Sequence, residues 1–276
     1  MKYQGVYFMK KSLIALMIAA GATVSVSGVA HAFSPSFSGD NISFSGTLTT
    51  PVAGVFEGKV SSLTGLDATI KAGESSVTIP VATDKGLLVL RSVSGGFDSS
   101  ASNKIANITF NGKTLAEAAG GSRFTEGKIN LTLDAQNNNG VDIGTITLPI
   151  QVAGVSVTVD NTSAQALGES LVADSASYAF HGGLPVKPDA AISSYDVAFN
   201  TVGSMAPDAT EYFPVATEKA DAAVSKSFSA ENKKFHAAYA AGIRSGDNIT
   251  LNLSSPATAG APVEWTASVP VVVTYK

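Results

Sequence analysis

The sequence predicts an all-β fold, and three observations lead to that prediction. Charged side chains make up only 14% of the chain, while Gly, Thr, Ser and Val are abundant, as is typical of sheets with weakly charged faces. Short alternating or apolar runs recur along the chain with turn residues between them. Long patterns with helical periodicity are scarce. Together these features favour an antiparallel sandwich.

The first 32 residues are expected to be a secretory signal peptide that is removed. A pair of lysines precedes an apolar run over 13–22, and the small-residue site Ala30-His31-Ala32 follows. A membrane anchor is the alternative, but the run is short and is interrupted by glycine, serine and threonine. Phe33 is therefore the predicted first mature residue, and translation starts at Met1 or Met9.

Charge and cysteine content narrow the possible partners of the mature chain. The signal peptide holds three lysines and no acids, so 15 basic and 22 acidic side chains remain, a net charge of −7. This balance argues against nucleic acid as a partner. A secreted chain without cysteine has no disulfides, so its stability must come from a large core, a ligand or assembly.

The first predicted strand of the mature chain is the stretch DNISFSGTLTTP over 40–51. Ile42, Phe44 and Leu48 share one parity with Gly46, while serine, threonine and asparagine occupy the other. The strand therefore has one apolar face, but no tight turn connects it to a partner strand.

Seven further strands are predicted before residue 160, over 53–60, 77–82, 87–93, 105–111, 129–133, 141–152 and 155–159. The clearest hairpin has Asn137-Asn138-Asn139-Gly140 at its turn, residue types that tolerate left-handed backbone conformations. Asp134, Gln136 and Asn138 could suggest a calcium loop. The spacing of the glycine and of a terminal glutamate is wrong for one, so a plain turn is favoured.

From about 160 to 231 the strand alternation fades, and Ala, Ser, Asp and Pro become more frequent. We interpret this stretch as an insertion in the sandwich, with a short helix expected over 217–226. The later segment AENKKFHAAYAAGI has helical propensity around its alanines.

The last segment alternates regularly from Val263 to Tyr275, and its odd positions include Val269, Val271 and Val273. It predicts a strand with one buried face. Pro270 cannot donate a ladder hydrogen bond, which is typical of an edge strand. A chain that ends on such a strand leaves a sheet edge open.

Catalytic chemistry has little support in the sequence. His181 and His236 are the two mature histidines, and no local ligand pair organises a zinc site, so no metal or cofactor is predicted. No nucleophile elbow or phosphate-binding glycine loop is present. A pair of acids that are distant in sequence stays possible in principle.

The two terminal strands can be ordinary opening and closing strands of one sandwich. Together with a signal peptide and no cysteine, they suggest instead that the leading strand of one molecule completes the sheet of the next. Here the sequence resembles a known family. The segment over 40–51 resembles the donor segment of chaperone-usher pilins, and VPVVVTYK resembles the terminal strand that their periplasmic chaperones grip.

Within that family the chain resembles the adhesive major subunits of enterotoxigenic Escherichia coli fimbriae of the K eighty-eight antigen type. The stretches GTITLPIQVAGV, YAFHGGL and AAYAAGIRSGDNITL carry the internal resemblance, while 185–229 matches poorly. Many pilins have a glycine where this chain has Val263, and most have a disulfide that is absent here, as in the adhesive branch. The resemblance also implies that Ala237 to Ile243 form a strand.

The resemblance implies an incomplete immunoglobulin-like sandwich over 52–276, completed by a donor strand from a neighbouring subunit and carrying an inserted mixed subdomain. It implies that Ile42, Phe44, Gly46 and Leu48 enter the neighbour. The chaperone-recognition strand would contain Val269, Val271, Val273 and Tyr275. Implied partners are identical subunits, a periplasmic chaperone, an outer-membrane usher and a host glycan, on a surface fimbrium reached through the periplasm.

Candidate glycan-binding residues are the aromatic side chains in and near the insertion, together with one histidine: Tyr178, Phe180, His181, Tyr195, Phe199, Tyr212 and Phe213. For any one of the aromatic residues, packing in the insertion's own core is the simpler explanation. Three other readings stay open: a secreted monomeric β-sandwich carbohydrate-binding module, a glycan hydrolase, and a tip-only adhesin that would need no donor strand.

Overall fold

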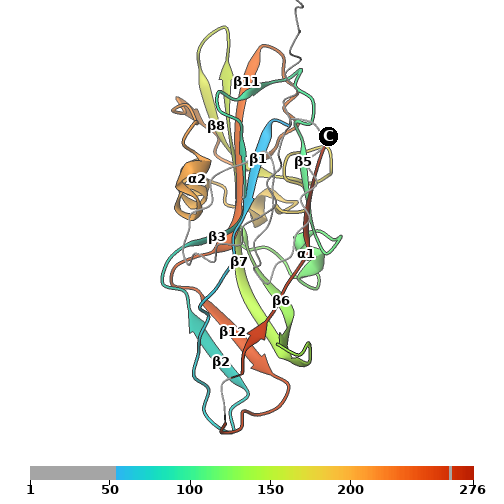
Figure 1. Ribbon diagram of the computed structural model, residues 1–276. Helices are drawn as coiled ribbons and strands as arrows, with labels where there is room; N and C mark the ends of the chain where they lie inside the picture. Colours follow the sequence, from blue (N-terminus) through green and yellow to red (C-terminus); the bar gives the residue numbers. More distant parts are fainter. Residues whose placement is uncertain (1–53, 261–262) are drawn as a thin grey trace, which may run out of the picture. The chain divides into compact units, whose positions relative to one another are not determined.

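The computed structural model describes residues 54–260 and 263–276, which form a mostly β-sheet fold (Figure 1). The strands are β1 (Phe56–Val60), β2 (Ser76–Pro80), β3 (Lys85–Ser92), β4 (Phe97–Asp98), β5 (Ala106–Phe110), β6 (Lys128–Asn137), β7 (Asp142–Asp160), β8 (Ala166–Val172), β9 (Glu218–Lys219), β10 (Val224–Ser225), β11 (Lys233–Ile243), β12 (Asn248–Leu253), β13 (Trp265–Thr266) and β14 (Val271–Tyr275). The helices are α1 (Leu115–Ala118) and α2 (Tyr195–Met205), with 3-10 turns η1 (Pro188–Ala190) and η2 (Pro207–Ala209). The all-β prediction is confirmed.

Two predicted segments, the signal peptide and the strand over 40–51, lie outside the described residues. Within the described ranges, no helix is long and apolar enough to cross a membrane.

Most strands belong to one large sheet whose main path is β1-β3-β11-β7-β12-β2. β6 and β8 also pair with β7, and the short strands β4, β9, β10 and β13 attach to this sheet. β14 pairs with β5 in a separate two-stranded sheet. The pairing is antiparallel except where β9 and β10 join β8.

The central strand of the large sheet is β7, which is 19 residues long. Its first half pairs with β6 and β12, and its second half pairs with β8 and β11. The prediction of two separate strands, 141–152 and 155–159, is therefore wrong. The strand continues through Gly154, where the break was expected, and the glycine is needed there because Leu184 packs against it. A Cβ atom at Gly154 would lie 2.7 Å from Leu184 Cδ1, so this glycine provides space for a side chain and does not form a turn.

β11 shows why the alanine-rich stretch is a strand despite its helical propensity. Phe235 and Tyr239 face the main hydrophobic core, and Ala238 and Ala240 face a second core on the other side of the sheet. A strand that is buried on both faces has no polar alternation. Here the sheet environment outweighs intrinsic propensity.

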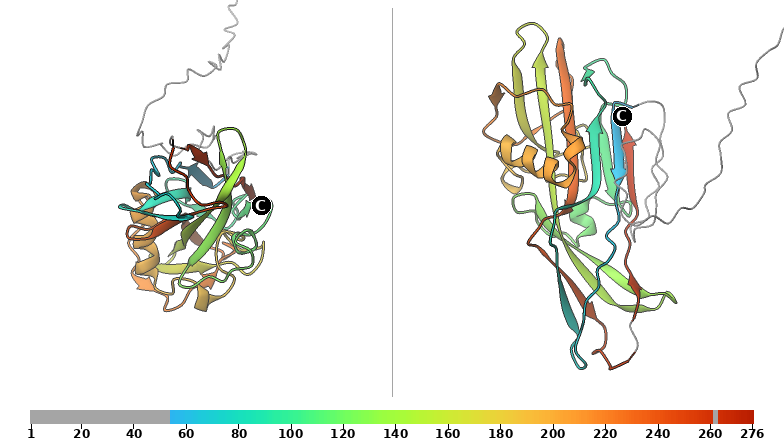
Figure 2. Two further views of the ribbon diagram at one scale, coloured as in Figure 1. Left: turned by 90° about the horizontal axis from the view of Figure 1, so that it is seen from below. Right: turned by 60° about the vertical axis from the view of Figure 1, so that its left-hand side comes forward.

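Two layers cover the large sheet (Figure 2). On one face, β5 and β14 enclose the main core, to which Ile108 and Val273 contribute. On the other face, α2 packs against β7 and β11 around Val155 and Val202.

The helix of the inserted segment lies over 195–205, so the helix predicted over 217–226 is wrong. Ser194 caps α2 by accepting a hydrogen bond from Val197 N, and the spacing of Tyr195, Ala198 and Val202 places them on one buried face. Residues 217–226 instead form β9 and β10, which extend the sheet beside β8.

Candidate functional site: two strand edges and an apolar groove

β1 is an edge strand of the large sheet. Main-chain hydrogen bonds from Val93 to Val55 and from Ser61 to Leu87 flank it, so its odd-numbered residues bond to β3. By the alternation of an antiparallel ladder, the peptide groups of its even-numbered residues face the opposite edge. Among the described residues, no strand pairs with that edge.

β14 presents a second edge of the same kind. Ile105 and Lys276 exchange two main-chain hydrogen bonds, of 3.0 and 2.9 Å, so the even-numbered residues of β14 bond to β5. The peptide groups of Val271, Val273 and Tyr275 therefore face away from β5. Within 54–260 and 263–276, no strand pairs with this side of β14.

The predicted terminal strand is shorter than the sequence suggested. The alternating run from Val263 is not one continuous strand, because it divides into β13 and β14. At the break, the Pro270 carbonyl accepts a hydrogen bond of 2.6 Å from Asn111 N, and proline has no N–H group to return one. The predicted buried face is present at Val269 and Val271, whereas Val263 is 64% exposed.

A groove of about 1630 Å³ lies along the chain segments that adjoin these two strands. One wall is 63–72, which follows β1, and the other consists of 254–260 and 263–267, which end shortly before β14. Its lining includes the apolar side chains of Leu63, Leu66, Val77, Leu133, Ile143, Ile146, Leu148, Leu251, Leu253 and Trp265. Seven of these ten are only partly buried, so the groove presents an extended apolar surface.

Hydrogen bonds hold the second wall, 254–260 and 263–267, against neighbouring segments. Ser254 N donates to the Ile143 carbonyl at 2.9 Å, and Ala257 N donates to the Glu74 carbonyl at 2.8 Å. The Asn138 amide at the β6–β7 turn donates to the Glu264 carboxylate. The groove is thus bordered by ordered backbone.

The candidate glycan-binding residues do not converge on one site. Phe180 is fully buried and stacks on Tyr239 with ring centroids 5.5 Å apart, so it belongs to the core. Tyr195 is only 5% exposed, and burial raises the pKa of its hydroxyl to about 12. For these two residues the simpler explanation, packing in a core, applies. Tyr212 is 40% exposed and lies over the Arg91 guanidinium.

The remaining candidates are partly buried and lie on both sides of the large sheet. Tyr178 packs against the main core, and His181 bridges to β5 through Asn107. Burial, followed by the positive charge of Lys276, lowers the pKa of His181. Phe199 and Phe213 pack against the second core under α2. The described residues contain no cluster of three or more His, Asp or Glu side chains that could hold a metal ion.

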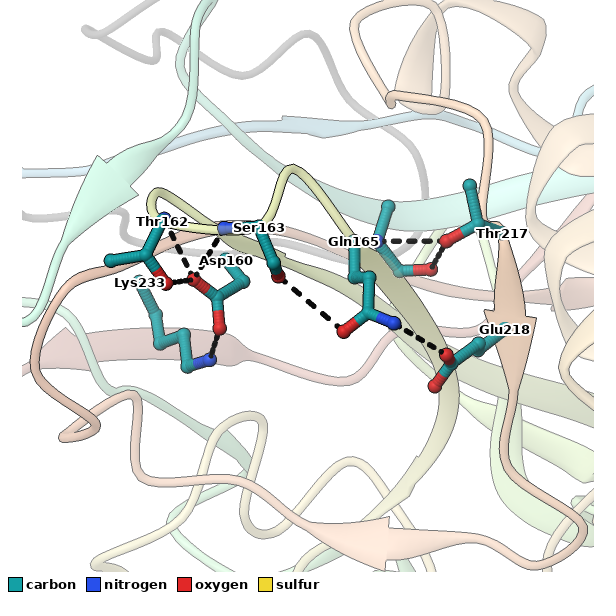
Figure 3. Close-up of polar contacts among 8 residues, drawn as sticks. Asp160, Thr162, Ser163, Gln165, Thr217, Glu218 and Lys233 are labelled. Carbon is teal, nitrogen blue, oxygen red and sulfur yellow. Dashed lines mark hydrogen bonds and ion pairs between the residues drawn. The ribbon is translucent and has the colours of Figure 1, made fainter.

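Polar contacts link the β7–β8 turn to neighbouring strands (Figure 3). Asp160 accepts hydrogen bonds from Thr162 and Ser163 and pairs with Lys233 of β11, and these contacts lower the pKa of Asp160. Gln165 donates to Glu218 of β9 at 3.1 Å. These bonds connect the turn to both β9 and β11.

The chain is similar to known proteins over nearly its whole length. The family model described as "Fimbrial, major and minor subunit" matches residues 9–276. The chain belongs to this fimbrial subunit family. It is 28% identical to K88 fimbrial protein AB of Escherichia coli, over 97% of this chain and all of that protein. It is also 28% identical to K88 fimbrial protein AC of Escherichia coli, over the same shares of the two chains.

Membership gives this fimbrial subunit a structural role in a surface fimbrium, in a family that is generally non-enzymatic. The terminal strand could be predicted from the sequence, whereas the groove walls could not. Leu63 and Leu66 lie in an irregular segment, so no strand or helix period marked them as lining residues. Arg91 was also missed, because nothing in its local pattern indicates that its partners lie at 57 and 208–212.

Proposed function

We propose that this fimbrial subunit polymerises by donor-strand exchange. The segment over 40–51 of one copy fills the groove of the next copy and pairs with the open edge of β14. The observations that carry the proposal are the edges of β1 and β14, with which no strand among the described residues pairs, and the apolar groove along the segments that adjoin these strands. Twelve extended residues span about 40 Å, comparable to the segment 263–275 beside which they would lie.

The apolar residues of the donor segment supply the stabilisation. Ile42, Phe44 and Leu48 would each contribute roughly 1.5–3 kcal/mol by burial. Donor main-chain groups would satisfy those of β14 that face the groove. With a high barrier to unfolding, such a link is long-lived without a covalent bond.

Gly46 provides a specific test of the donor register. It has no side chain, so it suits a shallow point of the groove. Replacing it in Gly46→Leu should prevent polymerisation, measured by electron microscopy of cells and by multimer ladders on unheated gels. Thr47→Leu, on the opposite face of the segment, is the matched control. Normal fibres from Gly46→Leu would count strongly against the donor role.

The C-terminal strand would serve assembly before the donor arrives. Val269, Val271, Val273 and Tyr275 would form the strand gripped by a periplasmic chaperone, which delivers the subunit to an outer-membrane usher. The same edge of β14 that pairs with the donor would first pair with the chaperone.

The inserted segment is the proposed receptor-binding part, and Tyr212 is its best-placed residue for stacking on a sugar. Tyr212→Ala should abolish binding of intact fimbriae to a host-type glycan array, and Tyr212→Phe should retain it, because stacking needs the ring. Val215→Ala, at an 87% exposed neighbour, is the control. Undiminished binding by Tyr212→Ala would remove this residue from the proposal.

Moving the donor segment tests the whole proposal. The mature chain is compared with a variant in which residues 40–51 follow Lys276 through a short linker. Donor-strand assembly predicts that the moved segment gives a soluble monomer with a much higher melting temperature, while the original chain polymerises or needs a chaperone. If the original is already a stable monomer and the move unfolds it, the chain is a closed sandwich. That result would favour the alternative, a monomeric carbohydrate-binding module.

A further inference from the structure

The strand that leads into the 63–72 wall of the groove, β1, has two chemically different faces. Phe56 and Val60 point into the main core, whereas Glu57 and Lys59 lie on the other face. In the β1–β3 ladder Glu57 is directly opposite Arg91, and both Nε and Nη2 of Arg91 lie 3.1 Å from Glu57 Oε2. An ion pair thus connects the charged face of β1 to β3.

Arg91 and Lys59 also contact the inserted segment. Arg91 Nη1 donates to the Asp208 carbonyl at 2.7 Å and lies 3.8 Å from a Glu211 carboxylate oxygen. Its guanidinium carbon is 5.0 Å from the centre of the Tyr212 ring. Lys59 of β1 reaches the Asp208 carboxylate at 3.1 Å. Residues 208–212 therefore contact both β1 and β3.

The two cations are mostly buried, whereas their acidic partners Asp208 and Glu211 are 34% and 58% exposed. The Arg91 side chain is 11% exposed and the Lys59 side chain 16% exposed, whereas both members of the Lys219–Asp196 pair on the same inserted segment are about half exposed. Ion pairs that are shielded from solvent are weakened less by salt and by the surrounding dielectric. The planar fork of arginine can bind a carboxylate and a carbonyl at the same time.

We propose that residues 208–212 brace the edge strand β1 through Arg91, so that the inserted segment stabilises the strand that leads into one wall of the groove. An edge strand paired on one side opens more readily than a central strand. Arg91 is a positioning residue in this scheme, because it acts on the groove through β1. Its importance for subunit linkage rests on the proposed function, whereas the bracing of β1 is a property of the fold that can be measured independently.

The first test uses hydrogen exchange with mass spectrometry on the full mature chain. Arg91→Gln removes the charge and is compared with Lys219→Gln, which breaks the exposed pair. Exchange in peptides covering 55–61 should become about tenfold faster in Arg91→Gln. Peptides from β7 should be unchanged, and Lys219→Gln should match the parent throughout. Unchanged exchange at 55–61, or equal acceleration in β7, would overturn the brace.

A charge swap separates the brace from the simple β1–β3 ion pair. Glu57→Arg combined with Arg91→Glu restores the cross-strand pair but places a carboxylate against the Asp208 carbonyl and Glu211. The brace predicts that β1 still exchanges fast in the swap. Recovery to the parent rate would mean that the cross-strand pair alone is sufficient, and the proposal would fail.

The effect of the brace on the link between subunits is measured by the rate at which multimers dissociate. Multimers of Arg91→Gln should dissociate about tenfold faster than parent multimers when heated in detergent, and Lys219→Gln multimers should match the parent. Equal rates for all three would refute the link between brace and groove. If moving residues 40–51 refutes donor-strand assembly, the hydrogen-exchange rates at 55–61 still decide whether the brace exists.

Discussion

The buried ion pair between Glu169 and Lys226 allows a quantitative prediction about stability. Glu169 is 6% exposed on β8 and accepts hydrogen bonds of 3.3 Å from Ser156 and Thr158, while the Lys226 ammonium neutralises it. Lys226→Met retains the length of the side chain but leaves the carboxylate buried without a countercharge. Removing one partner of a buried pair costs about 3 kcal/mol. For a chain of this size that corresponds to a fall in melting temperature of about 6–12 °C.

The assay is thermal and urea unfolding of matched full-length mature chains. Glu169→Gln combined with Lys226→Met should recover most of the loss, because the amide oxygen still accepts from Ser156 and Thr158 and no charge stays buried. Lys219→Met, in the exposed pair, should cost less than about 0.5 kcal/mol. A Lys226→Met chain as stable as the parent, or a double variant no better than the single one, would refute the reasoning.

Two further predictions concern backbone crowding and pH. A Cβ atom at Gly144 would lie 1.9 Å from the Asn252 carbonyl oxygen, so Gly144→Ala should separate β12 from β7. A Cβ atom at Gly140 meets no neighbour within 4 Å, so Gly140→Ala should lower the free energy of unfolding by only about 1 kcal/mol, several times less than Gly144→Ala. Denaturant midpoints measure both losses, and equal losses would contradict the crowding argument. Burial, and next the charge of Lys234, lower the pKa of His236 below 6.5, so the unfolded chain binds more protons and stability should fall as pH drops below about 6.5. In His236→Asn that part of the slope should disappear between pH 7.5 and 5, and a slope identical to the parent's would contradict it.

Particular residues show what could be predicted about the site. Val269, Val271 and Val273 were identified as one buried face, because a period of two is a local property of the chain. The length of the terminal strand was wrong, because Pro270 and the hydrogen bond from Asn111 end the ladder. Phe180 and Tyr195 were candidate glycan-binding residues for which core packing was the simpler explanation, and the tertiary fold buries both. Sequence alone does not distinguish an aromatic side chain that binds a ligand from one that fills a core.

The sequence by itself determined the all-β class, most strand positions and the family, since these depend on local periodicity and on stretches of similar residues. The tertiary structure decided which strand edges stay open, that β7 is one strand, that the helix lies over 195–205, and where the apolar groove runs. It also brought Arg91 against residues 57 and 208–212. The physical reason is that edges, grooves and ion-pair clusters are made by segments far apart in the chain, and their contacts leave no periodic signal in the residues that make them.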